Sequence, residues 1–234
     1  LNVNLKDDAA KINESGIKVA AIANYSFNPC HPDKAVLEKE FKNTAERIKI
    51  ASEMRDRPPL FIGTGSRNPM GGWVAHKDNL TEWAFKMSTM NLKRICRVAE
   101  EYDITLALEV GVSTVGYSGK RLRRLLNAVG SEKLKIHMDL ANFMTFPFRY
   151  FDHTEYMNEL FDELQGTIVD AHLKDFTVKY GHNISSVMDH AAPGKGELDW
   201  DTYLLRIDGE MGDRGYAIFE YVGLDELPEA RAFI

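Results

Sequence analysis

From residue 17 onward, the chain alternates short apolar runs rich in branched residues with longer amphipathic stretches. Buried parallel strands are short and continuously apolar, whereas the helices that cover them repeat every 3.6 residues, so this alternation predicts a β/α architecture. The predicted strands have the sequences IKVAAIA, LFIG, ITLALEV, LKIHMDL, TIVDAHL and YAIFEYV. The predicted helices lie near residues 33–55, 79–101, 119–129, 153–164 and 199–207.

Several residues mark where these helices begin and end. Asp33, and Asn79 followed by Thr81, are typical helix starts, and Gly130 is a typical helix stop. The chain shows no repeat beyond the β/α unit itself and no low-complexity linker. We therefore expect residues 1–234 to form a single domain.

Four predicted strands in succession carry a metal-competent side chain at or near their C-terminal ends. These side chains are Glu109, Asp139, His172 and Glu220. A lone acid at a strand tip usually only faces solvent, and that reading stays open for each position taken alone. The recurrence over four strands indicates a shared site.

Parallel strands joined by helices form either a doubly wound sheet or a (β/α)8 barrel. The early loops contain neither GxGxxG nor GxxxxGK[ST], whereas the chemistry lies at the ends of several later strands, as on the catalytic face of a barrel. We therefore predict an α/β fold of the (β/α)8 TIM barrel class. Only six strands are predicted, and the opening residues resemble the end of a helix, so we expect the first β-α-β segment to be missing from this chain.

A barrel also explains how four strand tips can serve one ion. Neighbouring strands lie about 4.8 Å apart, so the outer tips on a flat sheet would be roughly 14 Å apart. Curling the strands into a barrel turns the side chains inward toward a common point. Three carboxylates and one imidazole form a ligand set that consists mostly of oxygen atoms. Such a set favours Mn2+, with Mg2+, Co2+ and Zn2+ as alternatives.

The segments ALEV, HMDLAN, AHLKD, APGKGELDW and IFEY carry a resemblance to a known family. Through them the chain resembles the xylose isomerase-like (β/α)8 barrel superfamily, in its sugar phosphate isomerase/epimerase branch. The resemblance implies that Glu109, Asp139, His172 and Glu220 bind one catalytic divalent metal on the last four strands of the barrel. It also implies a homo-oligomer, and it does not specify the substrate.

The resemblance implies proton abstraction next to a carbonyl of a keto sugar, cyclitol or related polyol, through an enediolate. Glu109 and Glu220 would flank the sugar, one removing a proton and the other returning it. Alternatively, both glutamates only hold the metal. Loss of a hydroxyl from the same enolate would make the enzyme a dehydratase or lyase, and a non-catalytic metal- or sugar-binding subunit is a third reading.

Lys174 and Asn142 are further candidates. Lys174 is two residues after His172 and therefore faces the same side of the strand. It either donates a hydrogen bond to a developing alkoxide or forms a structural ion pair with Asp175 or another acid. Asn142 stands three residues after Asp139, where trinuclear zinc endonucleases of the superfamily have a histidine. A nucleic-acid endonuclease is therefore the last choice, and Asn142 is assigned to substrate binding.

Loops after the early strands supply the remaining candidates. Trp73 suits the apolar face of a sugar and is flanked by glycines that would let its loop act as a lid, although packing on the barrel is an equal alternative. His31 and His76 are candidate substrate contacts, but exposed loop histidines are commonly idle. The PGKG segment at residues 193–196 lacks the P-loop pattern and is assigned to a turn.

Composition excludes several other classes of function. The net charge is −6, from 29 Lys and Arg against 35 Asp and Glu, so nucleic acid is not an expected partner. No apolar stretch approaches the ~20 residues that span a bilayer, and the first residues do not resemble a signal peptide. A cytoplasmic protein without a membrane partner is expected. Cys30 and Cys96 are expected to be reduced thiols.

Overall fold

The computed structural model describes residues 5–109, 111–180 and 186–234. The chain divides into two compact units, which we call the first unit (Leu1–Tyr117 with Arg121–Lys135) and the second unit (Ser118–Lys120 with Ile136–Ile234). The single domain over residues 1–234 stays a prediction.

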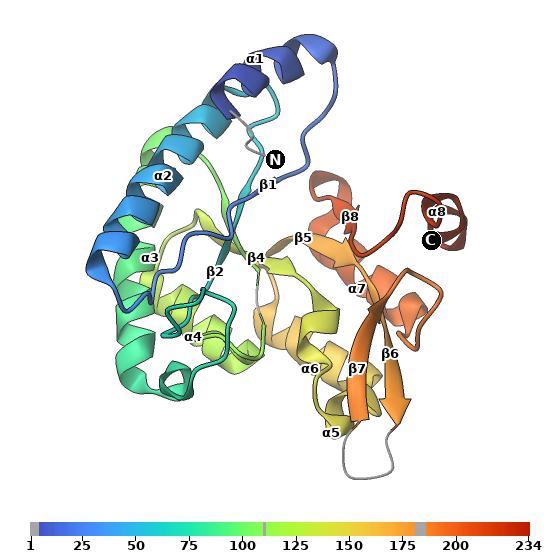
Figure 1. The fold of residues 1–234 in the computed structure, drawn as a ribbon. Coiled ribbons are helices and arrows are strands. Elements are labelled where there is room, and N and C mark those ends of the chain that lie inside the picture. The colour runs from blue at the N-terminus through green and yellow to red at the C-terminus, as the bar shows by residue number, and fades with distance from the viewer. Residues whose placement is uncertain (1–4, 110, 181–185) are drawn as a thin grey trace. The chain divides into compact units, whose positions relative to one another are not determined.

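The first unit contains three parallel strands and the helices that follow them in sequence. Its elements are α1 (Leu5–Ser15), β1 (Ile22–Ala23), α2 (Lys34–Glu53), β2 (Leu60–Gly63), η1 (Lys77–Leu80), α3 (Glu82–Tyr102) and β3 (Leu106–Glu109). Strand β2 pairs with β1 on one side and with β3 on the other. Helix α2 packs against both α1 and α3 (Figure 1). Helix α4 (Gly119–Val129) and strand β4 (Leu134–Met138) have residues in both units.

The second unit contains the later strands and an antiparallel hairpin. Its remaining elements are η2 (Leu140–Phe143), α5 (Pro147–Tyr150), α6 (His153–Leu164), β5 (Ile168–Leu173), β6 (Asp175–Tyr180), β7 (Ser186–Ala191), α7 (Trp200–Met211), η3 (Gly212–Arg214), β8 (Ala217–Phe219) and α8 (Leu227–Phe233). Strand β5 runs parallel to both β4 and β8. Strands β6 and β7 form the hairpin (Figure 1), and helix α7 packs on β5.

The predicted fold class is confirmed. The described residues contain six parallel strands, β1 to β5 and β8, of the eight in a complete barrel, and helices alternate with them along the chain. No helix in the described ranges is long and apolar enough to cross a membrane.

Several predicted boundaries are also confirmed. Asp33 caps α2 by accepting hydrogen bonds from the N–H groups of Ala35 and Val36, and Thr81 caps α3. Gly130 follows α4 in the left-handed region, at φ 69°. The first strand is much shorter than predicted, because the N–H of Val19 donates to the Asp56 carboxylate at 3.1 Å instead of to a neighbouring strand.

Both cysteines are free and buried, as expected for reduced thiols. Burial raises the pKa of the Cys30 thiol to about 11 and that of the Cys96 thiol to about 12. A thiol is nucleophilic only as the thiolate, so neither cysteine has the environment of a reactive residue.

Candidate metal centre

Strand β4 delivers Asp139 into the interior of the second unit. The residues of β4 are almost all buried, and Asp139 follows the last of them with no exposed surface. Its carboxylate also caps η2 by accepting a hydrogen bond from the N–H of Asn142 at 3.4 Å. The strand end and the short helix therefore fix the direction of this carboxylate.

Strand β5 positions His172, which is 5% exposed. The hydroxyl of Tyr203 on α7 donates to the carbonyl oxygen of His172 at 2.8 Å, so the helix that covers β5 also holds the backbone at this point. Glu220 follows β8, and its N–H donates to the carbonyl oxygen of Leu173 at 3.3 Å, which extends the pairing of β8 with β5 by one residue.

These three side chains converge on one point in the second unit. Nδ1 of His172 lies 3.1 Å from Oδ2 of Asp139 and 3.2 Å from Oε2 of Glu220. One ligand atom from each of the three lies within 4.8 Å of the other two. Ligands bound to one ion at about 2.0 to 2.2 Å are at most roughly 4.4 Å apart. The two distances from His172 fit this limit, and the convergence of the three side chains suits a divalent ion.

Lys174 reaches the same two carboxylates. Its Nζ donates to Oδ2 of Asp139 at 2.5 Å and to Oε2 of Glu220 at 2.6 Å, and to Oδ1 of Asn142 at 3.2 Å. Lys174 is 3% exposed, so its ammonium is the buried counter-ion of the two acids. Of the two roles considered for Lys174, the structure contains the ion pair, in which Asp139 and Glu220 are the acids.

The charges in this cluster stabilise one another. Burial acts to raise the pKa of Glu220, but hydrogen bonds from His172 and Lys174 outweigh it and lower that pKa to about 2. Burial acts to lower the pKa of Lys174, but the Asp139 and Glu220 carboxylates outweigh it and raise that pKa. At neutral pH, Glu220 is therefore ionised and Lys174 is protonated.

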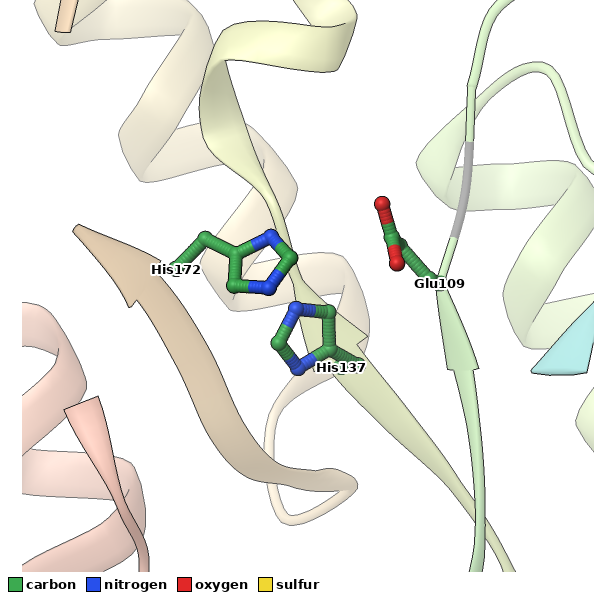
Figure 2. A group of neighbouring side chains, drawn as sticks. All are labelled: Glu109, His137 and His172. Carbon is green, nitrogen blue, oxygen red and sulfur yellow. The ribbon is translucent and has the colours of Figure 1, made fainter. Parts of the chain in front are cut away.

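Two buried groups, His137 and Asp170, form a neutral pair that packs against His172. Nδ1 of His137 on β4 is 2.5 Å from Oδ1 of Asp170 on β5, and the rings of His137 and His172 meet edge to face with centroids 4.0 Å apart (Figure 2). Burial lowers the pKa of His137 to about 3 and raises that of Asp170 to about 8. The pair thus packs against His172 without adding a charge beside it.

Glu109 ends β3 in the first unit, where it is 5% exposed. The hydroxyl of Tyr25 donates a hydrogen bond to its Oε2. The ring of Trp73 contacts Tyr25 edge to face at 5.6 Å. A Cβ atom added at Gly63 would lie 3.4 Å from the Trp73 ring, so a residue without a side chain lets the indole approach the strand end. Glu109 is therefore a buried carboxylate that is hydrogen-bonded to Tyr25, whose ring in turn contacts Trp73.

The two loop histidines have local structural roles. Nδ1 of His31 accepts the N–H of Asp33 at 3.0 Å, and Nδ1 of His76 accepts the N–H of Asp78 at 3.2 Å and so caps η1. Both lie in the first unit. Their contact with substrate, like that of Trp73 and Asn142, stays a prediction.

Asp175 has a structural role that the sequence did not predict. Its buried carboxylate accepts five hydrogen bonds at 2.8 to 3.1 Å, from the backbone N–H groups of Phe176, Gly194, Gly196 and Leu198 and from the indole N–H of Trp200. The segment APGKGELDW is therefore folded around this one side chain. Lys195 of PGKG pairs with Glu229 on α8, in line with a turn.

We expect Lys174→Met to destabilise the protein in the presence of EDTA. Breaking a buried ion pair typically costs 3–5 kcal/mol, and we expect about 3 kcal/mol because water can partly solvate Glu220. Denaturant unfolding measures the change. Lys179→Met, which removes an exposed pair with Asp189, is the matched control and should change stability by less than about 1 kcal/mol.

Manganese should raise the stability of Lys174→Met more than that of the wild type, because the ion replaces the missing positive charge. Equal stability of Lys174→Met and wild type in EDTA would contradict the counter-ion role.

The parallel strands and the convergent ligands define an α/β barrel protein with a candidate metal centre. The chain matches the xylose isomerase-like TIM barrel family over residues 4–234 and belongs to that family. The predicted family resemblance is thereby confirmed. Among curated proteins, no sequence matches the chain significantly.

Three solved structures illustrate the shared fold. A xylose isomerase-like TIM barrel protein from Mycobacterium smegmatis, in complex with magnesium, is 13% identical, with a TM-score of 0.71 and coverage of 100% of this chain and 76% of that chain. A D-tagatose 3-epimerase-like protein is 17% identical, with a TM-score of 0.73 and coverage of 98% and 80%. The 3-keto-D-glucoside 4-epimerase YcjR from E. coli, in its apo form, is 15% identical, with a TM-score of 0.66 and coverage of 98% and 82%. At these identities the likeness shows the fold alone.

Proposed function

We propose that this protein is a divalent-metal-dependent isomerase or epimerase that acts on a keto sugar, a cyclitol or a related polyol. The observation that carries the proposal is the convergence of Asp139, His172 and Glu220 at the ends of their strands in the second unit. Two of the proteins with similar folds are named as a sugar epimerase or as similar to one, and a third was solved in complex with magnesium. These likenesses support the same class of chemistry.

We further propose Glu109 as the fourth ligand. It ends β3 as a buried carboxylate, and the superfamily resemblance assigns a metal ligand to its position. Three carboxylates and one imidazole carry a formal charge of −3, which Lys174 only partly balances. A divalent cation compensates that charge, and oxygen ligands favour manganese or magnesium.

Each residue then has a defined task. A divalent ion, when bound, supplies positive charge at the substrate carbonyl and the neighbouring hydroxyl and so acidifies the C–H between them. Glu220 is ionised because His172 and Lys174 lower its pKa to about 2, so it can accept a proton or hold the ion. Glu109 takes the complementary role on the other side of the sugar.

Lys174 serves as a hydrogen-bond donor in this scheme. Its raised pKa keeps the ammonium protonated at neutral pH, where it can donate to the oxygen on which negative charge develops. Removing Lys174 would therefore slow turnover as well as destabilise the cluster.

Lys174 also favours one alternative outcome. A protonated ammonium beside Glu220 could protonate a departing hydroxyl, and a substrate with a hydroxyl β to its carbonyl would then lose water. The protein would be a dehydratase or lyase on a keto-polyol or keto-glycoside, with the same metal ligands.

The test follows proton exchange. The manganese-loaded protein is incubated in D2O with D-tagatose, L-ribulose and a keto-inositol, and NMR and mass spectrometry follow each sugar. Deuterium on the carbon next to the carbonyl, with the carbon skeleton and oxygen count unchanged, supports the isomerase or epimerase. Loss of water identifies the lyase. Absence of exchange with all three sugars overturns the proposal and leaves a binding role.

A further inference from the structure

The β6–β7 hairpin brings a histidine close to the metal cluster. In the register of the hairpin, His190 lies opposite Phe176, which is fully buried, whereas the preceding residue Asp189 faces the other way and forms an exposed ion pair with Lys179. His190 therefore lies on the inward face of the hairpin. The charges of Lys174, Asp139 and Glu220 act on its imidazole.

Tyr221 joins His190 to the cluster. The His190 and Tyr221 rings have centroids 4.5 Å apart with planes inclined by 31°, and Nζ of Lys174 lies 5.1 Å from the Tyr221 centroid. The His190 ring therefore lies no farther from the ammonium than the sum of these two distances.

The backbone of Tyr221 is strained. Its φ of 55° lies in the left-handed region, which bulky residues other than glycine rarely adopt. The side chain is 62% exposed, so core packing does not explain the strain. Strained residues concentrate at functional sites, and this one directly follows a proposed metal ligand.

His190 has an unused hydrogen-bonding atom. Its Nδ1 is shielded from water and has no hydrogen-bond partner among the described residues. Unsatisfied buried polar atoms are rare in native proteins because they are unfavourable. Burial and Lys174 lower the pKa of the imidazole, so the ring is neutral and one nitrogen can accept while the other donates.

We propose that His190 and Tyr221 form a substrate-recognition wall that contacts the part of a polyol beyond its carbonyl and the adjacent hydroxyl. The Tyr221 ring would cover C–H groups of the sugar, and His190 would hydrogen-bond a distal hydroxyl after a small rotation of the exposed Tyr221 ring opens Nδ1. This inference rests on the proposed function and assigns the specificity of the same site.

The test compares a long and a short substrate on the manganese-loaded protein. D-tagatose can reach the wall, whereas dihydroxyacetone contains little beyond the carbonyl and its neighbouring hydroxyls. His190→Phe keeps an aromatic ring and removes the nitrogens, His190→Asn keeps hydrogen bonding, and Tyr221→Gly removes the ring and relieves the positive φ. Asp189→Asn, on the opposite face of the same strand, is the control.

We expect His190→Phe and Tyr221→Gly to lower kcat/KM for deuterium exchange into D-tagatose by roughly 10- to 100-fold, and to change that for dihydroxyacetone by less than about 3-fold. His190→Asn should recover part of the D-tagatose activity. Metal content should stay at the wild-type level in all variants.

Equal losses on both substrates, or no loss on either, would overturn the recognition wall while leaving the proposed function intact. The long substrate is D-tagatose or, if the wild type does not exchange it, whichever of L-ribulose and the keto-inositol the wild type does exchange. If the metal-loaded wild type exchanges protons of none of these three, the proposed function fails, and the inference fails with it. The control variant Asp189→Asn should match the wild type on both substrates, and a tenfold loss there would also overturn the assignment of the inward face.

Discussion

Replacing Asp139 with asparagine is expected to abolish metal binding and activity with little change in shape. The amide has the size of the carboxylate but no negative charge and only one oxygen acceptor. Asp139 is fully buried and contacts His172, Lys174 and, through its other oxygen, the N–H of Asn142. Turnover should fall on the order of 1,000-fold or more.

Glu220→Gln should lose activity to a similar extent, since it removes the carboxylate that both His172 and Lys174 contact. Elemental analysis measures the metal content of each variant. Deuterium exchange into the ketose on which the wild type is active measures its turnover. Glu229→Gln is the control, because Glu229 is exposed and pairs with Lys195, away from the cluster of ligands. Retention of both metal and activity by Asp139→Asn would contradict the site.

Asp175→Ala is expected to have the largest effect on stability. The substitution leaves four backbone N–H groups and the Trp200 indole without their buried acceptor. Each unsatisfied buried donor costs about 1–3 kcal/mol, so the total loss should be at least about 5 kcal/mol. For a chain of this size that corresponds to a fall in Tm of roughly 10 °C or more.

Thermal and denaturant unfolding in EDTA measure this loss independently of the metal. The Tm of Asp175→Asn should lie between the Tm of Asp175→Ala and that of the wild type, because the single amide oxygen can accept only some of the five hydrogen bonds. Asp201→Asn, an exposed acid at the start of α7, should change Tm by no more than about 2 °C. A Tm for Asp175→Ala within a few degrees of the wild type would show that the loop does not depend on this carboxylate.

The strand ends could be predicted from the sequence because they depend on residues that are adjacent in the chain. An apolar run that stops at an acid or histidine predicts both the strand and the residue that it presents, and this held for the geometry of Asp139, His172 and Glu220. The helix caps at Asp33 and Thr81 were readable for the same reason, since a cap bonds only to its own first turn.

The features that could not be predicted depend on contacts between residues that are far apart in the sequence. Asp175 gains its role from backbone N–H groups up to 23 residues away, and backbone donors leave no sequence signature. The β6–β7 hairpin mixes polar and apolar residues without a regular alternation, so its pairing, and with it the inward face of His190, emerged only from the structure. Lys174 had two plausible types of acid partner, and only the fold selects Asp139 and Glu220.

The most direct measurement is the metal content of the wild-type protein, purified, treated with EDTA and then dialysed against manganese. We expect one divalent ion per chain by elemental analysis, together with a rise in Tm that EDTA reverses, because an ion that binds only the folded state stabilises it. A protein that retains no manganese, and whose Tm does not respond to it, would contradict the metal centre at Asp139, His172 and Glu220.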